Sequence, residues 1–318
     1  MKMKVDIVYL WCNDADAEWS AKRKKYMPRK GYDNQAVCRG RFVQNDELKY
    51  SLRSVAKYMP WVNHIYIVSD SQVPAWLNLK NPKITMVKHE EILPKECLPL
   101  FNSNAIECGL ANIPNLSEYF AFMNDDMLLT SPITNEDFFS KSGKIIYRMT
   151  YVKPLRQPTM YEAKILDMQN LCAQKYGYRC KYFPHHNLDV YSKSTYKECL
   201  ADINELVQET LNNRFRSQND WQRVIVSYYM LAKGYGELKV INKYKESVWA
   251  WLKHNFLDLG KKDSLVLTLH NKNYDKKLRR CKPKFLCMED GEYVDDKDRK
   301  RGKDFLEALF TDKSEFEK

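Results

Sequence analysis

One segment of the chain passes from an apolar strand pattern to adjacent carboxylates without any transition. Phe120-Ala121-Phe122-Met123 has the pattern of a buried strand, and Asn124-Asp125-Asp126 follows it directly. Two neighbouring acids are poorly tolerated in a core, whereas oxygen ligands at the end of such a strand suit a hard divalent cation. For an isolated Asp-Asp pair, a polar turn is the simpler interpretation. The remaining sequence must decide between a turn and a metal site.

Strand and helix patterns alternate along residues 1–150. The expected elements are strands at 5–11, 64–68, 83–87 and 119–123 and helices at 45–58 and 103–112. This alternation predicts an α/β fold with a doubly wound, mostly parallel sheet. Ligands of such sheets bind beyond the carboxyl ends of the strands, where Asn13-Asp14, Ser69-Asp70 and Asn124-Asp125-Asp126 are expected. Three polar clusters on one edge favour a ligand site over a turn.

The second half of the chain is more helical. Its expected elements are helices at 197–211 and 221–233, an irregular region at 151–196, an apolar run ending in acids at 285–290, and a short helix at 303–310. We therefore expect an α/β core over residues 1–150, a helical and loop-rich part over 151–290 that closes the same site, and a charged tail over 291–318.

Composition and charge restrict the class of partner. The 318 residues are 44% hydrophobic, as in a globular protein, and carry a net charge of +11. That charge favours polyanions: nucleic acid, an anionic membrane surface or phosphate-bearing sugars. It is concentrated in Lys22-Arg23-Lys24-Lys25 with Arg29 and Lys30, and in 272–284, although solvated basic faces would have the same pattern. Only 10 glycines are present and none forms a phosphate-binding loop, which argues against typical dinucleotide or P-loop enzymes.

Cysteine usage and hydropathy point to a cytoplasmic protein. The nine cysteines are scattered without CxxC pairs or Cys/His clusters, so a zinc site is not expected and the thiols are expected to be reduced. The amino-terminal residues lack a signal-peptide pattern, and no apolar run approaches the roughly 18 residues of a membrane span. Attachment to the inner face of the cell membrane through the basic faces remains open.

Four separated blocks resemble the conserved blocks of one family. They are residues 6–16, residues 41–126, His186 with Lys193-Ser194, and residues 285–290. In this order they resemble the Stealth family, whose members are hexose-1-phosphate transferases: bacterial capsular polysaccharide phosphotransferases and the catalytic subunit of the animal lysosomal-enzyme GlcNAc-1-phosphotransferase. The chain departs from the family pattern at Leu10, Cys12, Asp14, Asn104 and Glu289. These departures bear on substrate contacts and leave the reaction class unchanged.

The resemblance implies a GT-A-like fold and a specific reaction. A hydroxyl of a sugar or polysaccharide acceptor attacks the sugar-bearing phosphorus of a nucleotide-sugar donor such as UDP-GlcNAc, and nucleoside monophosphate leaves. The phosphodiester product belongs to a capsular or other cell-surface polysaccharide. A metal-dependent glycosyltransferase that forms a glycosidic bond is the alternative. A nucleic-acid-binding module is disfavoured, because strand-end acids would repel phosphates without a metal.

The acids of the second and fourth blocks are the expected metal ligands. Asp125 and Asp126 would hold Mg²⁺ or Mn²⁺ on the donor diphosphate, and Asp290 is assigned to the same ion. Which of Asp125 and Asp126 touches the metal is left open.

The expected substrate-binding residues come from the first two blocks. Asn13 and Asp16 would hold the nucleotide, and Arg41 and Arg53 would supply forked donors to phosphate oxygens. The next set is Asn102, Ser103 and Glu107, of which Glu107 would orient a ligand hydroxyl. Arg53 could instead form a surface ion pair, and Glu107 could be a helix-surface carboxylate.

His186 is the expected general base for the acceptor hydroxyl, because histidine side chains titrate near neutral pH. Its spacing from Lys193-Ser194 selects it over the adjacent His185. Arg216 would stabilise transition-state charge, with Asp220 nearby as a substrate-binding residue. The alternative is that Arg216 and Asp220 form a salt bridge at a helix start.

Overall fold

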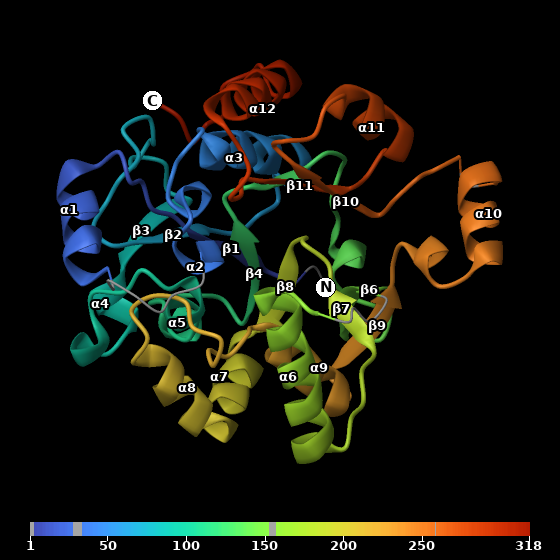
Figure 1. Ribbon diagram of the computed structural model, residues 1–318, viewed down its shortest axis with the longest axis horizontal. Helices are drawn as coiled ribbons and strands as arrows, with labels where there is room; N and C mark the ends of the chain where they lie inside the picture. Colours follow the sequence, from blue (N-terminus) through green and yellow to red (C-terminus); the bar gives the residue numbers. More distant parts are fainter. Residues whose placement is uncertain (1–2, 28–33, 153–156, 258) are drawn as a thin grey trace.

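The computed structural model describes residues 3–27, 34–152, 157–257 and 259–318. At its centre lies a five-stranded sheet of order β3-β2-β1-β4-β8 (Figure 1). Its strands are β1 (Val5–Leu10), β2 (Ile65–Ser69), β3 (Ile84–Lys88), β4 (Tyr119–Asn124) and β8 (Asp189–Ser192). The pairings among β3, β2, β1 and β4 are parallel, and only β8 runs antiparallel to its neighbour. The predicted mostly parallel α/β sheet is confirmed.

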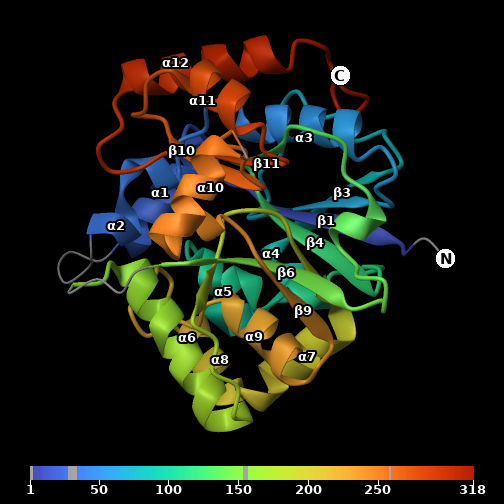
Figure 2. The same cartoon turned by 90° about the vertical axis from the view of Figure 1, so that its right-hand side faces the viewer.

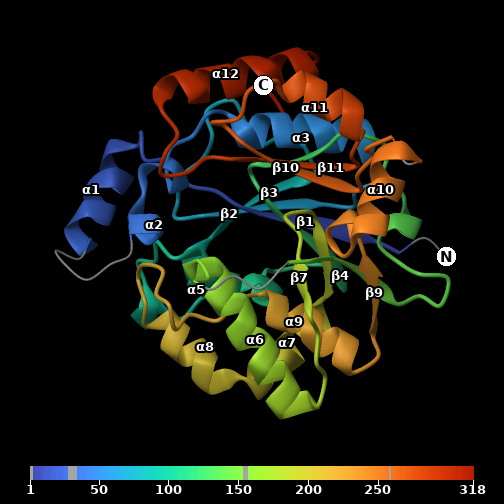
Figure 3. The ribbon, with the colours of Figure 1, turned by 45° about the vertical axis from the view of Figure 1, so that its right-hand side comes forward.

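Helices cover both faces of this sheet, which explains why β1, β2 and β4 are buried along almost their whole length. On one face lie α3 (Glu47–Tyr58), α11 (Tyr274–Cys281) and α12 (Asp296–Leu309). On the other lie α5 (Ser103–Glu107), α6 (Met160–Tyr176), α7 (Lys193–Asp202), α8 (Asn204–Leu211) and α9 (Val224–Ala232) (Figure 3). In the parallel register Leu10 is opposite both Val68 and Asn124. The polar residues that follow these strands therefore meet at one edge, as the sequence predicts.

Two smaller sheets extend this edge. One consists of β10 (Ser264–Thr268), β11 (Phe285–Glu289) and β5 (Met127–Leu129), and the other of β7 (Tyr182–Pro184), β6 (Ile145–Tyr151) and β9 (Gly236–Val240). Because β5 directly follows Asp126 and runs antiparallel to β11, Met127 is opposite Cys287, and the Met288 amide donates to the Asp126 carbonyl at 2.9 Å. The acids that end β4 and β11 are thereby brought together.

The expectation of an irregular region at 151–196 is wrong. The segment contains α6 (Met160–Tyr176), a helix of 17 residues, as well as β7 and β8. The helix begins with a capping box between Thr159 and Glu162 and ends at Gly177, which has a φ of +69°. Its buried side includes Lys164 beside Ile165 and Met168, so a charged residue interrupts the apolar stripe that would have revealed it.

Three other predicted helices differ in their bounds. The helix predicted at 103–112 is α5 (Ser103–Glu107) followed by a 3₁₀ turn, and that at 197–211 is divided into α7 (Lys193–Asp202) and α8 (Asn204–Leu211). The helix predicted at 221–233 is α9 (Val224–Ala232). The remaining helices are α1 (Ala17–Tyr26), α2 (Asn34–Val37), α4 (His89–Ile92) and α10 (Val248–Phe256). The 3₁₀ turns are Arg39–Arg41, Lys95–Cys97, Leu110–Asn112, Asn135–Asp137 and Lys243–Lys245.

The charged tail packs onto the body of the protein. Its helix α12 is longer than the predicted 303–310 segment, and Phe305, Leu306 and Phe310 bury their side chains in a second apolar cluster with Tyr50 and Leu128. The three-part division at residues 150 and 290 stays a prediction. Strands from its first two parts nevertheless pair with each other, β8 with β4 and β11 with β5.

Candidate active site

Two adjoining cavities open at the carboxyl ends of the central strands. The smaller, of about 220 Å³, is lined by strand-end residues such as Trp11, Cys12 and Asp125. The larger, of about 500 Å³, is lined mainly by residues from the second half of the chain, including His186 and Glu289. The residues that line both are Arg41, Ser103, Asn124, Asp126, Arg216 and Asp290. These shared residues mark the junction at which two substrates could meet.

Asp126 is an incompletely paired acid at this junction. Its Oδ1 atom is buried and has no hydrogen-bond partner among the described residues. Burial raises the pKa of Asp126 well above its ordinary value, and the charges of Asp125, Glu289 and Glu47 raise it further. A bound cation would offset both the cost of burying this charge and the repulsion from the neighbouring carboxylates. The residues present therefore fit a divalent metal ion.

Asp125 and Glu47 complete this carboxylate cluster. Burial raises the pKa of Asp125, whose Oδ2 accepts a hydrogen bond from Gln44 Nε2 at 2.8 Å. Burial, followed by repulsion from Asp125, raises the pKa of Glu47 to about 7. Asp125 lines the smaller cavity, whereas Asp126 borders both. Asp126 is thus the better placed of the two to touch an ion shared by both substrates.

Asp290 lies at the junction but has a strong partner of its own. Arg299 donates Nε to Asp290 Oδ2 at 2.7 Å and Nη2 to Oδ1 at 3.0 Å. The Gly291 amide also donates to Asp290 Oδ1 at 2.7 Å. Arg299 thus already neutralises this carboxylate. The metal-ligand role of Asp290 stays a prediction.

The two adjacent histidines have different surroundings. His186 Nε2 is 3.4 Å from Glu289 Oε1, and its half-exposed side chain lines the larger cavity. His185 Nδ1 is 2.7 Å from Ser264 Oγ, and its Nε2 is 3.2 Å from Asn242 Nδ2. Both ring nitrogens of His185 thus have protein partners, whereas His186 is paired with the acid Glu289. Both histidines line the larger cavity, and the choice of His186 as the base stays a prediction.

Cys287 adds a thiol to this part of the site. His186, Cys287 and Glu289 each offer a ligand atom within 4.8 Å of the others, a spacing compatible with a metal ion. No Cys/His spacing in the sequence indicated such a cluster, because it forms only when the loop after β7 meets β11.

Cationic side chains line the same cavities. Arg41 and Arg216 lie at the junction, and Lys164 on α6 lines the larger cavity. Burial, then repulsion by Arg41, lowers the pKa of Arg216, and burial lowers that of Lys164. Gathering cations in a buried site is costly unless they bind an anion, and phosphate oxygens meet that requirement. Sequence reasoning missed Lys164 because it lies in the segment expected to be irregular.

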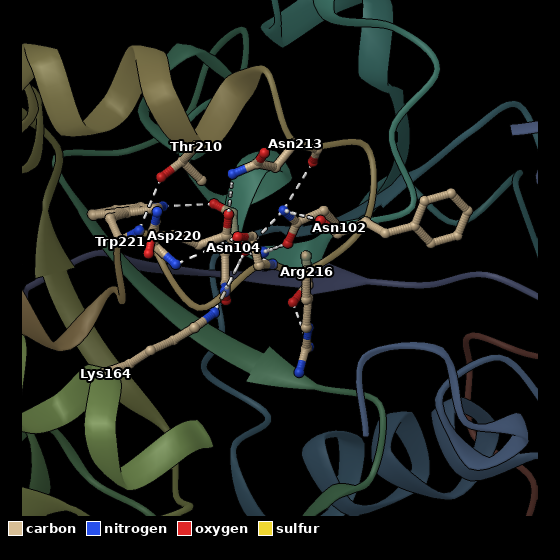
Figure 4. Close-up of polar contacts among 12 residues, drawn as sticks. Asn102, Asn104, Lys164, Thr210, Asn213, Arg216, Asp220 and Trp221 are labelled. Atoms are coloured by element: carbon tan, nitrogen blue, oxygen red, sulfur yellow. Dashed lines mark hydrogen bonds and ion pairs between the residues drawn. The ribbon is translucent and has the colours of Figure 1, made fainter. Parts of the chain in front are cut away.

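Asp220 is the centre of a hydrogen-bond network behind the cavity wall (Figure 4). Its Oδ2 accepts from Asn102 Nδ2 at 3.0 Å, from the Ser217 amide at 2.8 Å and from Lys164 Nζ at 3.5 Å. Further donors are Asn104 Nδ2 to Oδ2 and Asn213 Nδ2 to Oδ1. Asp220 and Asn102 are not among the described residues that line the two cavities. They instead fix the loop that carries Arg216, whose Nη2 donates to Ser103 Oγ.

Asn13 and Asp16 are not brought to either cavity as far as the described residues show. The Asn13 side chain accepts from the Ala15 amide at 3.0 Å, and Asp16 caps α1 by accepting from the Trp19 amide at 2.9 Å. Both side chains shape the turn after β1. Their nucleotide contacts stay a prediction.

Arg53 lies away from the site, in a buried ion pair with the carboxyl-terminal segment. Its Nη2 is 2.7 Å from Glu317 Oε2, and its Nη1 donates to the Phe310 carbonyl at 2.7 Å. Arg53 therefore forms an ion pair, which was the alternative to phosphate binding, although the pair is buried and not on the surface.

Glu107 lines the larger cavity and is not a helix-surface carboxylate. Burial raises its pKa, and its Oε2 is 3.4 Å from Arg223 Nε. Arg223, which the sequence analysis did not select, also lies 3.8 Å above the Phe122 ring centroid.

Two residues of the amino-terminal basic run form ion pairs. Lys22 pairs with Asp70 at 2.9 Å and Arg23 with Asp14 at 2.9 Å, while Arg29 and Lys30 lie outside the described residues.

Comparison with known proteins places these residues in a family. Residues 41–147 match conserved region 2 of the Stealth proteins. The chain is 35% identical over 257 residues to Exopolysaccharide phosphotransferase cps2G of Lactiplantibacillus plantarum, covering 71% of this chain and 75% of that protein. It is 34% identical to Capsular polysaccharide phosphotransferase fcs1 of Haemophilus influenzae, covering 72% and 66%. It is 32% identical to Capsular polysaccharide phosphotransferase SacB of Neisseria meningitidis serogroup A, covering 99% and 57%.

The chain thus spans 57–75% of the length of these three relatives. Among solved structures, it is similar over 96% of its length to the galactosyltransferase LgtC in complex with donor and acceptor sugar analogs, at 11% identity and a TM-score of 0.45. The sequence relatives and the matched region show that the chain belongs to the Stealth family.

Proposed function

We propose that this protein transfers a sugar 1-phosphate from a nucleotide sugar, such as UDP-GlcNAc, to a hydroxyl of a sugar or polysaccharide acceptor. The acceptor oxygen bonds to the sugar-bearing phosphorus, and the bond from that phosphorus to the bridging oxygen of the diphosphate breaks. Nucleoside monophosphate leaves with that oxygen, and the hydroxyl proton passes to a base. The product is a phosphodiester of a capsular or other cell-surface polysaccharide.

One observation carries the proposal: the junction between the two cavities joins an incompletely paired carboxylate, Asp126, to the cations Arg41 and Arg216. Phosphoryl transfer needs both, because charge spreads over the phosphate oxygens as the reaction proceeds. The smaller cavity, at the ends of β1 and β4, is the proposed donor site. The larger cavity, which contains His186, is the proposed acceptor site.

A divalent cation, Mg²⁺ or Mn²⁺, is the proposed cofactor. Asp126 would hold it, with Asp125 and Glu289 as neighbours whose charge it would balance. When bound, such an ion neutralises the oxygens of the donor diphosphate and of the leaving phosphate.

His186 is the proposed base. Glu289, 3.4 Å from His186 Nε2, would orient the imidazole and stabilise it once it carries the acceptor proton. Arg216 and Lys164 would bind the non-bridging phosphate oxygens. Ser103 and the Asp220 network hold Arg216 in place before substrate arrives, which reduces the reorganisation required in the transition state.

We also propose that the protein works in the cytoplasm, where nucleotide sugars are the donors, and that it associates with the inner face of the cell membrane. None of the described helices is long and apolar enough to cross a membrane. The proposed association is through the surface of the fold.

The reaction is tested with a donor carrying ³²P in the sugar-bearing phosphate. The purified protein, Mg²⁺ or Mn²⁺, a panel of nucleotide sugars and oligosaccharide acceptors would be incubated together. We expect release of unlabelled nucleoside monophosphate and label in the acceptor. Release of labelled nucleoside diphosphate with an unlabelled acceptor would instead establish the alternative, a metal-dependent glycosyltransferase.

The base is tested by comparing the two histidines. His186→Ala is expected to reduce turnover by about 10²- to 10⁴-fold, the usual contribution of a general base. His185→Ala is the matched control and should have a smaller effect on turnover, since its ring nitrogens contact Ser264 and Asn242. A larger loss in the His185 variant would reassign the base.

A further inference from the structure

Helix α10 and the residues after it expose an unusual number of large apolar side chains. Of the twelve that the described residues expose, half lie within residues 248–259. We call this group the α10 patch: Val248, Trp249, Trp251, Phe256, Leu257 and Leu259. The Trp249 side chain is 82% exposed and Leu257 is 75% exposed. Exposed apolar side chains gathered in one short segment in this way mark an interaction site.

The patch is held out from the body of the protein. Every residue of α10 is at least partly exposed, and the helix lies at the edge of the molecule, beyond β9 and β10 (Figures 1 and 2). It is attached by its other side, where His254 stacks on Tyr244 with ring centroids 4.3 Å apart and Asn255 accepts from Arg280 Nη2 at 2.9 Å. Val248, Trp249, Leu252 and Phe256 are spaced to share the outer face.

Cations surround this apolar face. Arg280 belongs to α11, so the contact with Asn255 places the basic segment 272–284 beside α10. That segment has seven lysines and arginines and one acid, Asp275. Its exposed cations include Lys272, Lys276, Arg279, Arg280 and Lys282, and Lys253 and Lys261 are exposed next to the patch itself.

We propose that α10 and α11 form a docking surface for an anionic lipid bilayer, in which the α10 patch enters the membrane interface and the α11 cations contact lipid phosphates. Trp249 shares one helix face with Val248, Leu252 and Phe256, and lysines and arginines flank it. Such a face matches the apolar boundary and negative surface of an anionic bilayer. A second copy of the chain fits less well, because a symmetric contact through α10 would bring the two cationic α11 helices together.

This docking also gives the acceptor a route to the site, a consequence that rests on the proposed function. A cavity of about 350 Å³ runs from His186 and Tyr161 to Tyr244 and Lys262. Tyr244 is the residue on which α10 is stacked. A bilayer bound to α10 would therefore lie near the outer end of this cavity, and an acceptor held at the membrane surface could enter it and reach His186.

Binding is tested by flotation of the full chain with two kinds of vesicle, phosphatidylcholine alone and phosphatidylcholine mixed with phosphatidylglycerol. We expect binding to the mixed vesicles, weakened by high salt. Trp249→Ser with Phe256→Ser should weaken it by at least about tenfold, as expected for two aromatic side chains removed from the interface. Lys276→Glu with Arg279→Glu should weaken it by at least about 25-fold, from about fivefold for each lost cation.

The matched control is Val73→Ser with Leu79→Ser, which removes exposed apolar side chains outside α10 and should leave binding unchanged. Brominated lipids should quench part of the tryptophan emission of the wild type. This quenching should be lost in the Trp249/Phe256 variant, which lacks the tryptophan of the outer face. Circular dichroism verifies that each variant is folded.

Three outcomes would overturn the proposal: no binding of the wild type to anionic vesicles, equal binding by the Trp249/Phe256 variant, or a dimer in light scattering that this variant dissociates. Turnover with soluble donor and acceptor should be the same in the α10 variants and the wild type. If the wild type binds vesicles but transfers no sugar phosphate, the proposed function fails while the docking surface stands.

Discussion

Asp126 and Asp220 are acids of the site with opposite surroundings: the Oδ1 atom of Asp126 is buried, and Asp220 is buried as a whole residue. Asp220 accepts hydrogen bonds from the Ser217 amide, three asparagine side chains and Lys164. Asp126 has one buried oxygen without a partner in the described chain and other carboxylates as neighbours. A satisfied buried carboxylate stabilises the fold around it, whereas an unsatisfied one costs stability. The contrast separates a structural acid from one that awaits a ligand.

The largest expected effect is that of Asp126→Asn. The substitution should reduce turnover by on the order of 10³-fold, because it removes a ligand of the proposed metal and its charge. It should not lower the free energy of unfolding, since it also removes repulsion from Asp125, Glu289 and Glu47. Turnover and urea denaturation measure the two effects. The wild type should also show a rise in Tm with Mn²⁺ that the variant lacks.

Normal turnover of Asp126→Asn would contradict the proposal that Asp126 holds the metal ion. Asp125→Asn is the control that decides between the two adjacent acids. A greater loss in Asp125→Asn, with the metal-dependent rise in Tm abolished there, would move the proposed ligand to Asp125.

Asp220→Asn should act mainly on stability. Its amide would place N–H groups against donors and leave Lys164 without its counter-charge, so we expect a loss of about 3 kcal/mol in the free energy of unfolding. Urea denaturation measures this loss. If Asp220→Asn were as stable as the wild type and its turnover were as low as that of Asp126→Asn, Asp220 would take part in the chemistry. Asp220 would then no longer be a purely structural acid.

The effect of Lys164→Met should be intermediate between those of Asp126→Asn and Asp220→Asn, because Lys164 contacts Asp220 and also lines the larger cavity. We expect about a tenfold loss in kcat/KM, corresponding to one charge-assisted hydrogen bond to phosphate. Steady-state kinetics with varied donor and acceptor would show which substrate is affected. Lys175→Met, on the exposed side of the same helix, is the control and should leave kcat/KM unchanged.

The smallest effect concerns Glu317, which pairs with Arg53 far from the cavities. Burial raises the pKa of Glu317, but hydrogen bonds from Arg53 and from Ser314 outweigh it, so that the folded-state pKa lies below the ordinary value. The pair therefore stabilises the fold above the ordinary glutamate pKa and loses its effect as the pH falls through the lowered value.

The amide of Glu317→Gln keeps an oxygen that can accept from Arg53, so the substitution should cost about 1 kcal/mol at pH 7 and less at pH 3. Urea denaturation at both pH values measures the difference, and turnover should be unchanged. An equal loss of stability at both pH values would show that charge is not what the pair contributes.

Much of the central sheet could be predicted from the sequence because its signals are local. The apolar run 119–123 and the acids after it follow directly on one another in the chain, and the parallel register then brings three strand ends together. Helix α6 was missed for an equally local reason: Lys164 occupies a buried position in its apolar stripe. Its capping box, Thr159 with Glu162, was the available signal.

Other assignments depended on partners distant in the chain. Arg53 and Glu317 are 264 positions apart, so an arginine that suits phosphate in the sequence is an ion-pair residue in the fold. Asn102 and Asp220, 118 positions apart, were both expected to touch substrate, yet they contact each other behind the cavity wall. Glu289 lies beside His186 only because β11 pairs with β5.

The sequence by itself determined the fold class, the family and the place of the acids at the strand ends, because periodicity and contiguous motifs are properties of neighbouring residues. Only the tertiary structure decided which buried acid is satisfied and which is not. Hydrogen-bond partners, burial and neighbouring charges come from segments that fold together from far apart in the chain, and these set the free energy of a buried carboxylate. They distinguish Asp126 from Asp220, and His186 from His185.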